Sequence, residues 1–298
     1  MPDKVYLNLV GGLGNQLFQI SAGHAYAQKN GRQLHVLYRP QADHYGRTLL
    51  VDQMLGDELK RQIVFQSKRD MGSVRRASRK LRRRLWPASY IEEDLHSAKP
   101  DSRLAEPAPP GTVELFGFWQ DEVFFEPVIP QLRGQIRIDL PLEGRYREMQ
   151  QEIERSESVC LGVRLYEDDQ RDQTHVAEQS FRQLMASANR LESRYPQARF
   201  FLFSSSHNRI MDELCGGRPN YTFCRTADGF CDTVPTLQLM SHCQHHIFNQ
   251  STYYWWAAWL SETRHGQGRH LIRPPERLFS PSRSGIPTRW VESAQALA

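Results

Sequence analysis

The stretch from residue 236 to 261 constrains the fold of this chain more than any other part. An apolar run at 246–248 ends in the polar residues 249–252, and a segment with three tryptophans follows at once. The run predicts a buried strand, and Ser251 or Thr252 is a good N-cap for a helix behind it. Free N–H groups at such a helix start favour an anion, so the turn suits phosphate binding. Taken alone, a buried and well-capped helix without a ligand is the commoner interpretation.

A second strand and turn open the chain. Residues 5–10 predict a strand, 11–16 a glycine-rich turn, 17–28 a helix and 34–37 the next strand, which together make a βαβ unit. The turn lacks the third glycine of the dinucleotide fingerprint, and Arg39 stands where that motif has an acidic residue, so NAD binding is not indicated. The glycines still let the backbone approach a ligand closely.

A third predicted strand lies mid-chain and ends at an arginine. Residues 159–163 are apolar and deliver Arg164 at their carboxyl end, before the acidic residues Glu167, Asp168 and Asp169. In open α/β sheets these strand ends face the ligand crevice, and a guanidinium is the forked donor that suits diphosphate oxygens. Taken alone, an arginine after a strand is more often a solvated surface residue.

Three segments together resemble one enzyme family. GGLGNQLFQ near the start, VRLYE in the middle and LQLMSHCQHHI followed by STYYWWAAWL resemble the inverting α-1,2-fucosyltransferases of glycosyltransferase family 11, which use GDP-fucose. The segment 115–120 looks like the family's GY(F/W)Q segment, and an ending with Ile286, Pro287 and Trp290 is also typical.

The resemblance implies an α/β fold of the GT-B type, with two Rossmann-like domains and a cleft between them. We expect an acceptor-side domain at 1–145, which carries the glycine-rich turn and a proline-rich loop at 100–111, and a GDP-fucose-binding domain at 146–298. Alternating strands and helices in the second domain favour a doubly wound parallel sheet. The expected strands there are 159–164, 200–203, 221–224 and 245–248, and the expected helices are 180–193, 207–215, 234–242 and the tryptophan-rich segment.

The resemblance also implies roles for single residues. Arg164 takes the position of the arginine that contacts the diphosphate in the family's HxRxxD-like motif, and Glu167 takes the position of its aspartate. Three positions depart from the family pattern: Gly162 replaces a histidine, Gln250 an asparagine and Thr236 an acidic residue.

The candidate site residues follow from the motifs and the resemblance. The candidate catalytic residues are Arg164 and Glu167. The candidate donor-binding residues are Gly12, Gly14, Asn15, Arg164, Ser204, Ser205, Gln250, Ser251 and Thr252. The candidate acceptor-binding residues are Trp119 and Gln120. The serine-rich turn at 203–206 follows another predicted strand and suits contact with ribose or guanine, although an ordinary polar turn fits it equally well.

The activity implied by the resemblance is transfer of L-fucose from GDP-β-L-fucose to the 2-hydroxyl of a terminal galactose, for a surface polysaccharide such as O-antigen. In a single displacement, negative charge grows on the leaving diphosphate, so donors at its oxygens stabilise the transition state. Arg164 is the first such donor, the 251–252 turn the second and the 11–15 loop the third. The base for the acceptor proton stays open between the carboxylates at 167–169 and a diphosphate oxygen.

Composition agrees with this activity. The chain of 298 residues is long enough for two domains, and its net charge of +4 suits an anionic nucleotide sugar. Five cysteines without close CxxC pairs indicate a reducing compartment and no zinc site. Neither a signal peptide nor a transmembrane helix is indicated. Animal members of the resembled family carry a membrane anchor, so the resemblance implies a bacterial-type cytoplasmic enzyme here. We expect it to need no metal or other cofactor.

Two rival interpretations stay open. The acidic cluster at 167–169 fits a metal-dependent glycosyltransferase of another sugar specificity, because paired carboxylates hold Mn²⁺ or Mg²⁺. Alternatively, the altered middle motif belongs to a catalytically inactive module that binds a nucleotide sugar or a membrane surface.

The segment 68–86 is strongly basic, with nine Lys or Arg and one acidic residue. Met71, Val74, Leu81 and Leu85 fall at helical spacing, which predicts an amphipathic helix with one apolar stripe. Such a helix suits peripheral contact with the inner face of an anionic membrane, or a lipid-pyrophosphate-linked acceptor. A solvated basic helix packed by its leucine stripe fits equally well. No aromatic platform accompanies the charges, so nucleic acid is not an expected partner.

Overall fold

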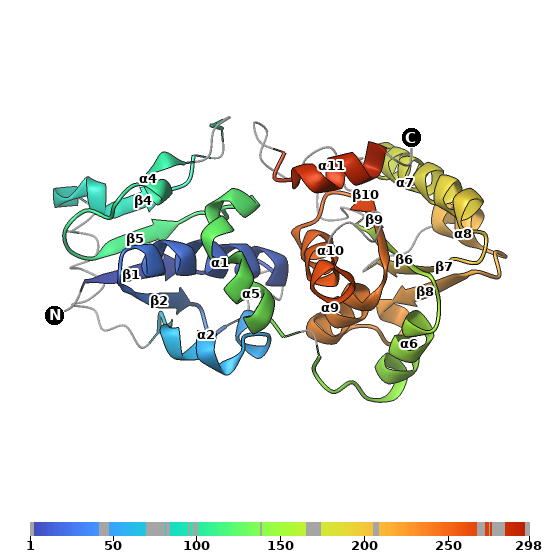
Figure 1. The fold of residues 1–298 in the computed structure, drawn as a ribbon, viewed down its shortest axis with the longest axis horizontal. Helices are drawn as coiled ribbons and strands as arrows, with labels where there is room; N and C mark the ends of the chain where they lie inside the picture. Colours follow the sequence, from blue (N-terminus) through green and yellow to red (C-terminus); the bar gives the residue numbers. More distant parts are fainter. Residues whose placement is uncertain are drawn as a thin grey trace. The chain divides into compact units, whose positions relative to one another are not determined.

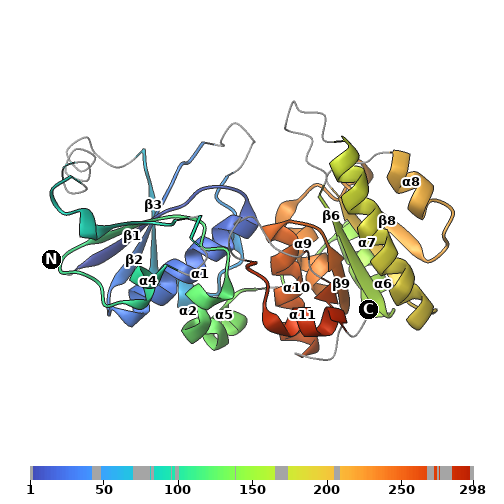
Figure 2. The same cartoon turned by 90° about the horizontal axis from the view of Figure 1, so that it is seen from above.

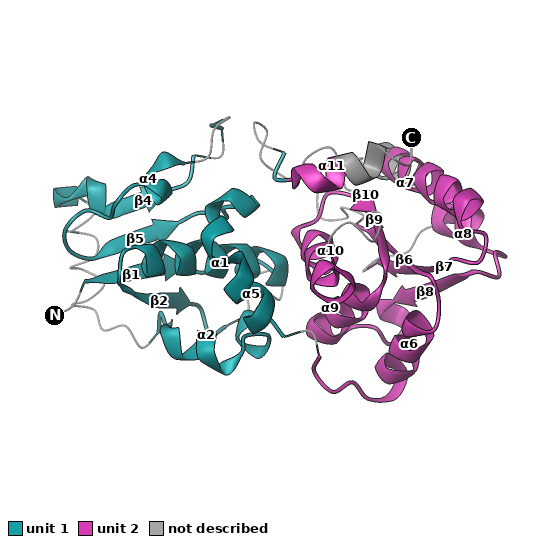
Figure 3. Cartoon of the chain, viewed as in Figure 1, with its two compact units in different colours: residues 1–137, 279–285 teal, residues 138–278, 286–298 magenta. Residues whose placement is uncertain are grey.

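The chain forms two compact units in a computed structural model (Figures 1 and 3). Unit 1 comprises Met1–Arg137 and Phe279–Gly285, and unit 2 comprises Ile138–Leu278 and Ile286–Ala298. The domain boundary expected at residue 145 falls inside a helix of unit 2. The structure describes residues 3–41, 48–69, 81, 84–94, 96–97, 101–137, 139–164, 174–204, 209–266, 272–273, 275 and 284–295.

Unit 1 is built on a parallel sheet in the order β3-β2-β1-β5-β4. Its strands are β1 (Lys4–Asn8), β2 (Gln33–Tyr38), β3 (Ile63–Ser67), β4 (Tyr90–Glu92) and β5 (Val113–Phe116). In register, Val5 of β1 lies between Leu34 of β2 and Val113 of β5. The chain runs outward from β1 to β2 and β3, and β5 then pairs on the other side of β1. The strand order therefore reverses between β1 and β5.

The helices of unit 1 correct two expectations. They are α1 (Leu13–Lys29), α2 (Asp57–Gln62), α4 (Ser102–Ala105) and α5 (Ile129–Gln135). The turn expected at 11–16 is shorter, because α1 already begins at Leu13. Gly12 is its N-cap, and the N–H of Gln16 donates to the Gly12 carbonyl at 3.0 Å, which closes the first helical turn. The expected loop at 100–111 contains α4, whose N-cap Asp101 accepts from the Arg103 N–H at 3.1 Å.

Unit 2 is built on a second parallel sheet, in the order β10-β9-β6-β7-β8. Its strands are β6 (Ser158–Val163), β7 (Arg199–Ser204), β8 (Tyr221–Arg225), β9 (His245–Phe248) and β10 (Ile272–Arg273). The last rungs of β6 pair Val163 with Ser204 of β7 and Gly162 with Phe248 of β9. The expected doubly wound parallel sheet is confirmed.

Helices cover both faces of the second sheet (Figure 2). They are α6 (Gly144–Glu154), α7 (Thr174–Arg194), α8 (Arg209–Cys215), α9 (Thr233–His242), α10 (Thr252–His265) and α11 (Thr288–Gln295). Alternate residues of β6, Val159, Leu161 and Val163, pack with α7 and α8 in one buried cluster. Gly162, between two of them, faces α10 instead. This alternation is the period of two that a strand imposes.

The tryptophan-rich helix α10 is a core helix. Trp255, Trp256 and Trp259 are fully buried, and Trp255 also contacts the ring of Trp290 from α11, with centroids 5.2 Å apart. The buried carboxylate of Glu262 accepts from the Trp290 indole at 2.8 Å and also pairs with Arg289. These contacts give a structural reason for the tryptophan at the end of the chain. A helix that is apolar on all sides is one that is buried on all sides.

Candidate functional site

The strand order of unit 2 reverses between β6 and β9. From β6 the chain winds outward through β7 and β8, whereas β9 and β10 lie on the other side of β6. Ligands in open α/β sheets bind at the carboxyl ends of the strands beside such a switch point. Arg164 follows β6 directly, and Gln250, Ser251 and Thr252 follow β9. The structure therefore brings the candidate arginine and the candidate turn to the same edge of one sheet.

The side chain of Asn249 holds the main chain of Arg164. Its Oδ1 accepts from the Arg164 N–H at 2.8 Å, and its Nδ2 donates to the Arg164 carbonyl at 2.7 Å. The N–H of Asn249 itself donates to the Gly162 carbonyl at 3.2 Å. Sequence reasoning did not place Asn249 in the site, because an asparagine after a strand carries no signal for a partner 85 residues away.

Helix α10 begins at the same switch point. Ser251 is its N-cap residue, with extended backbone (φ −161°, ψ 125°), and its carbonyl accepts from the Trp255 N–H at 3.0 Å. The predicted N-cap position is thus confirmed, although the Ser251 side chain makes no capping hydrogen bond. The positive end of the helix dipole lies next to Arg164, and both features favour an anion.

Tyr254, in the first turn of α10, covers Gly162. A Cβ at residue 162 would lie 2.5 Å from Cγ of the Tyr254 ring, so only glycine leaves room for this ring. The Tyr254 hydroxyl lies 3.0 Å from the carbonyls of both Val163 and Phe203. The space beside Cα at the family's histidine position is therefore occupied by a tyrosine from another element.

Of the remaining candidates in unit 2, the structure describes Ser204. Ser204 is the last residue of β7, is buried and pairs in register with Val163. Glu167 and Ser205 lie outside the described residues, as do Asp168 and Asp169. Among the described residues at the carboxyl ends of β6, β7 and β9 there is no histidine.

The switch point of unit 1 also joins two candidates. Gly11 and Gly12 follow β1, and the segment Gly117 to Gln120 follows β5. The Gln120 amide donates to Oδ1 of Asn15 at 3.0 Å, so a residue predicted for the acceptor meets one predicted for the donor. Gly11 has φ +84°, and a Cβ there would lie 2.7 Å from Nδ2 of Asn15. Glycine is therefore required at residue 11.

Trp119 lies in this segment, but its side chain is fully buried. Its backbone is left-handed with φ 46°, the one such non-glycine residue in the described chain. The buried carboxylate of Glu93 holds this conformation by accepting from the N–H groups of Phe118 at 2.7 Å and Trp119 at 2.9 Å. The buried indole thus shapes the loop, and the acceptor contact of Trp119 stays a prediction. Glu93 carried no sequence signal.

A histidine with a lowered pKa lies in unit 2 away from this edge. His245 is the first residue of β9, at the amino end of the strand. Burial, and to a smaller extent the nearby His265, lower the pKa of His245 to about 4. His245 is therefore neutral at neutral pH and belongs to the folded core.

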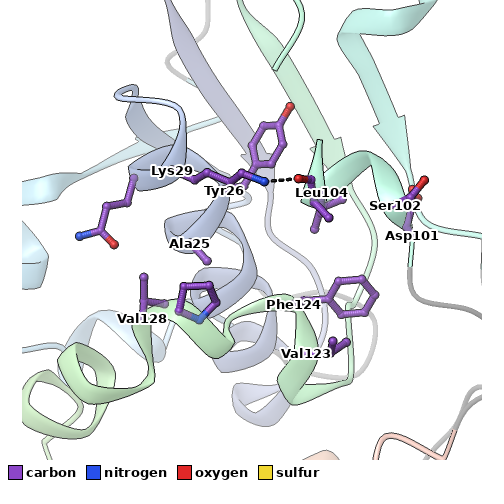
Figure 4. A pocket seen from close by; sticks show the side chains of 12 residues that line it. Ala25, Tyr26, Lys29, Asp101, Ser102, Leu104, Val123, Phe124 and Val128 are labelled. Carbon is purple, nitrogen blue, oxygen red and sulfur yellow. Dashed lines mark hydrogen bonds between the residues drawn. The ribbon is translucent and has the colours of Figure 1, made fainter. Parts of the chain in front are cut away.

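A pocket of about 490 Å³ lies in unit 1 at the carboxyl-terminal end of α1 (Figure 4). Its walls are mainly apolar and include Tyr26, Leu104, Phe124 and Val128. Lys29 closes one side by donating to the Ala105 carbonyl. Because α1 runs antiparallel to the strands, this pocket is at the opposite end of the helix from Gly12 and is separate from the candidate site.

Other features of the described residues bear on the expected cofactors. No group of three or more His, Cys, Asp and Glu that could hold a metal ion occurs among them. All five cysteines are free, and four of them are buried. No helix in the described part of the chain is long and apolar enough to span a membrane.

Comparisons with known proteins agree on one family and one fold. The model for Glycosyl transferase family 11 matches residues 4–268. An Escherichia coli alpha-1,2-colitosyltransferase is 27% identical, over 96% of this chain and 98% of the relative. The fucosyltransferase NodZ from Bradyrhizobium has a TM-score of 0.51 at 15% identity, over 87% of this chain and 92% of its own. An Arabidopsis thaliana FUT1 mutant in complex with GDP also has a TM-score of 0.51, at 11% identity, over 95% of this chain and 72% of its own. At these identities the two structures show the shared fold.

Proposed function

This chain belongs to glycosyltransferase family 11, and we propose that it transfers L-fucose from GDP-β-L-fucose to the 2-hydroxyl of a terminal galactose with inversion. The observation that carries the proposal is the switch point of unit 2. There the main chain of Arg164 is fixed beside the start of α10, and the two features together suit a diphosphate. The GDP bound to the structurally similar Arabidopsis protein supports the same ligand class.

The proposed reaction is a single displacement at the anomeric carbon. The galactose oxygen forms the new bond on one face, while the bond to the diphosphate oxygen breaks on the other. Charge then grows on the leaving GDP, where the Arg164 guanidinium and the backbone N–H groups of Ser251 and Thr252 stabilise it. By resemblance, Glu167 orients the arginine. The acceptor proton goes to a carboxylate of 167–169 or to a diphosphate oxygen.

The acceptor side of the proposal rests on unit 1. Gln120, the predicted acceptor contact, is partly exposed at the β1–β5 switch point, where hydroxyl groups of a sugar can use its amide as donor and acceptor. It bonds Asn15, the predicted donor contact, which is also partly exposed. Gly11 and Gly12 let the backbone approach a ligand there. Gly14, in contrast, is buried in the first turn of α1 and supports the loop.

A second donor is favoured by one observation. The Escherichia coli relative, which matches nearly the whole chain, is named a colitosyltransferase. Colitose lacks the 3-hydroxyl of fucose. This chain departs from the usual family motif at Gly162, and such a departure fits a changed preference for the transferred sugar. Parallel assays with GDP-fucose and GDP-colitose separate the two donors by their kcat/KM values.

We also propose that the reaction needs no metal ion. The Arg164 guanidinium supplies a fixed positive charge, which is one way to neutralise a diphosphate without Mg²⁺. Full activity in excess EDTA supports this. Activity that is lost in EDTA and restored by Mn²⁺ or Mg²⁺ would instead favour a metal site at 167–169.

The proposed cellular role is assembly of a surface polysaccharide such as O-antigen, in the cytoplasm against the inner membrane face. Leu81, Leu85 and Trp86 are 56%, 54% and 62% exposed, within a segment that carries nine basic residues. The amphipathic helix expected there covers residues that the structure does not describe (70–80, 82 and 83). Sedimentation with anionic vesicles tests the contact. Replacing Leu81, Leu85 and Trp86 by serine is expected to abolish vesicle binding. The control Val123→Ser, at an exposed apolar residue elsewhere in unit 1, is expected to leave it unchanged.

One experiment tests the activity as a whole. Purified protein is incubated with each GDP-sugar and a panel of β-galactosides, and the linkage of any product is determined by NMR. An α-1,2-linked fucosyl or colitosyl galactose supports the proposal. Tight binding of the GDP-sugar without transfer would identify an inactive binding module.

A further inference from the structure

We propose that Asn249 and Tyr254 are positioning residues that fix three strand ends as one rigid cradle for the donor diphosphate. This inference rests on the proposed function, because it takes the β6–β9 switch point as the donor site. Neither residue was among the candidates from the sequence, and both act through the residues that they hold and not on the reacting atoms.

The side chain of Asn249 continues the hydrogen bonding between β6 and β9 by one residue beyond the regular strand pairs. The last regular pair between β6 and β9 is Gly162 with Phe248. Beyond it the two chains separate, since one continues through Arg164 and the other turns into α10. The Asn249 amide then supplies both an acceptor and a donor to the Arg164 main chain, at 2.8 and 2.7 Å, as a neighbouring strand would. The backbone from which the Arg164 guanidinium projects is thereby tied to the turn that starts α10.

Tyr254 ties the same helix to β6 and β7. Its hydroxyl has one proton and lies 3.0 Å from each of two carbonyls, Val163 and Phe203, so the two acceptors share it. Val163 directly precedes Arg164, and Phe203 directly precedes Ser204. The ring is held above Gly162, where no side chain competes with it.

The consequence is mechanical coupling of the elements proposed to bind the donor. Asn249 bonds the Arg164 backbone, and Tyr254 bonds the carbonyls at the ends of β6 and β7. The Ser251–Thr252 turn lies between these two residues in the chain. Donors to a developing charge are effective only if they need no reorganisation during the reaction. Loss of either clamp is therefore expected to loosen diphosphate contacts while leaving the acceptor contacts of unit 1 intact.

The test compares Asn249→Leu and Tyr254→Phe with the matched control Tyr253→Phe. Tyr253 is the neighbouring residue of the same helix turn, and its hydroxyl also donates to a main-chain carbonyl, that of Thr233 at 2.5 Å. Both tyrosine variants lose one hydroxyl from a similar setting, but only Tyr254 contacts the strand ends. Asn249→Asp serves as a second, near-isosteric variant, which keeps the acceptor oxygen and loses the donor.

The measurements are the Kd for GDP by calorimetry, the KM for the GDP-sugar and for the galactoside, and Tm. We expect Asn249→Leu and Tyr254→Phe to weaken GDP binding and raise the donor KM by about tenfold or more, with the acceptor KM unchanged. The control Tyr253→Phe is expected to lower Tm at most, with GDP binding and both KM values unchanged. If the folded Asn249→Leu and Tyr254→Phe proteins bind GDP with wild-type affinity, this inference is overturned but the proposed function is not. A wild-type protein that does not bind GDP overturns the proposed function, and this inference with it.

Discussion

The side-chain amide of Gln120 donates a hydrogen bond to Oδ1 of Asn15 at 3.0 Å, across the point where the strand order of unit 1 reverses. This bond joins the end of β5 to the first turn of α1. In unit 2 the Asn249–Arg164 bonds span the corresponding point between β6 and β9. In each sheet, an amide side chain therefore joins the two chain segments beside the switch point, where α/β folds bind their ligands.

The Asn15–Gln120 bond predicts coupled effects on activity. Asn15→Ala and Gln120→Ala each lower kcat/KM, and the double variant loses less than the sum, with a coupling energy of about 1 kcal/mol. Steady-state kinetics of the four proteins of this cycle give the value. Gln131→Ala is the matched control, because this glutamine bonds His24 of α1 at 3.0 Å near the other end of the helix. Additive effects of the first pair would show that the bond does not matter for catalysis.

Arg164→Ala is predicted to lower kcat by about 10²–10³-fold, the usual scale for removing one donor to a developing charge. Arg164→Lys keeps the charge but not the forked geometry and recovers only part of the loss. Single-turnover rates on protein with an unchanged circular dichroism spectrum provide the measurement. A folded Arg164→Ala protein with near-normal turnover would rule out the assigned role.

Gly162→Ala is predicted to lower the free energy of unfolding by about 1–3 kcal/mol, because the new Cβ would overlap the Tyr254 ring. In a Tyr254→Ala background the same change costs much less, since the ring that it meets is gone. Urea unfolding of the four proteins gives both values. Equal costs in the two backgrounds would contradict the contact. A histidine at residue 162, as in the family motif, is expected to be tolerated only in that second background.

His245 predicts a pH dependence of stability. Its folded-state pKa of about 4 lies below its ordinary value of 6.5, so the unfolded chain binds more protons between these two pH values. The stabilisation is complete above pH 6.5 and is lost as the pH falls toward 4, by up to about 3 kcal/mol. Urea unfolding across this range should show a shallower slope for His245→Phe than for the wild type. Parallel profiles would mean that the pKa of His245 is the same in the folded and the unfolded protein.

Much of the fold could be predicted because its signals are local. The strands at 159–163, 221–224 and 245–248 are short apolar runs between polar residues, and they appear within one residue of the expected bounds. The three- and four-residue strands β4 and β5 were missed, because runs as short as YIE and VELF carry no period. The early start of α1 was missed because its first turn holds a glycine and polar residues that are typical of loops.

The site was predictable only in part, for a related reason. Arg164 and Ser251 follow strands, so topology alone brought them to one edge. The partners that fix them act over long sequence separations: Tyr254 reaches Val163 across 91 residues, and Glu93 reaches Trp119 across 26. Trp119 is a related case: its motif predicted a contact with the acceptor, but the sequence did not indicate that packing buries its ring.

The binding of a nucleoside diphosphate at the β6–β9 switch point is tested most directly by a crystal structure of the protein with GDP. We predict diphosphate oxygens within hydrogen-bond distance of the Arg164 guanidinium and of the N–H groups at Ser251 and Thr252. GDP bound elsewhere in unit 2, with Arg164 turned away from its phosphates, would contradict the proposed function.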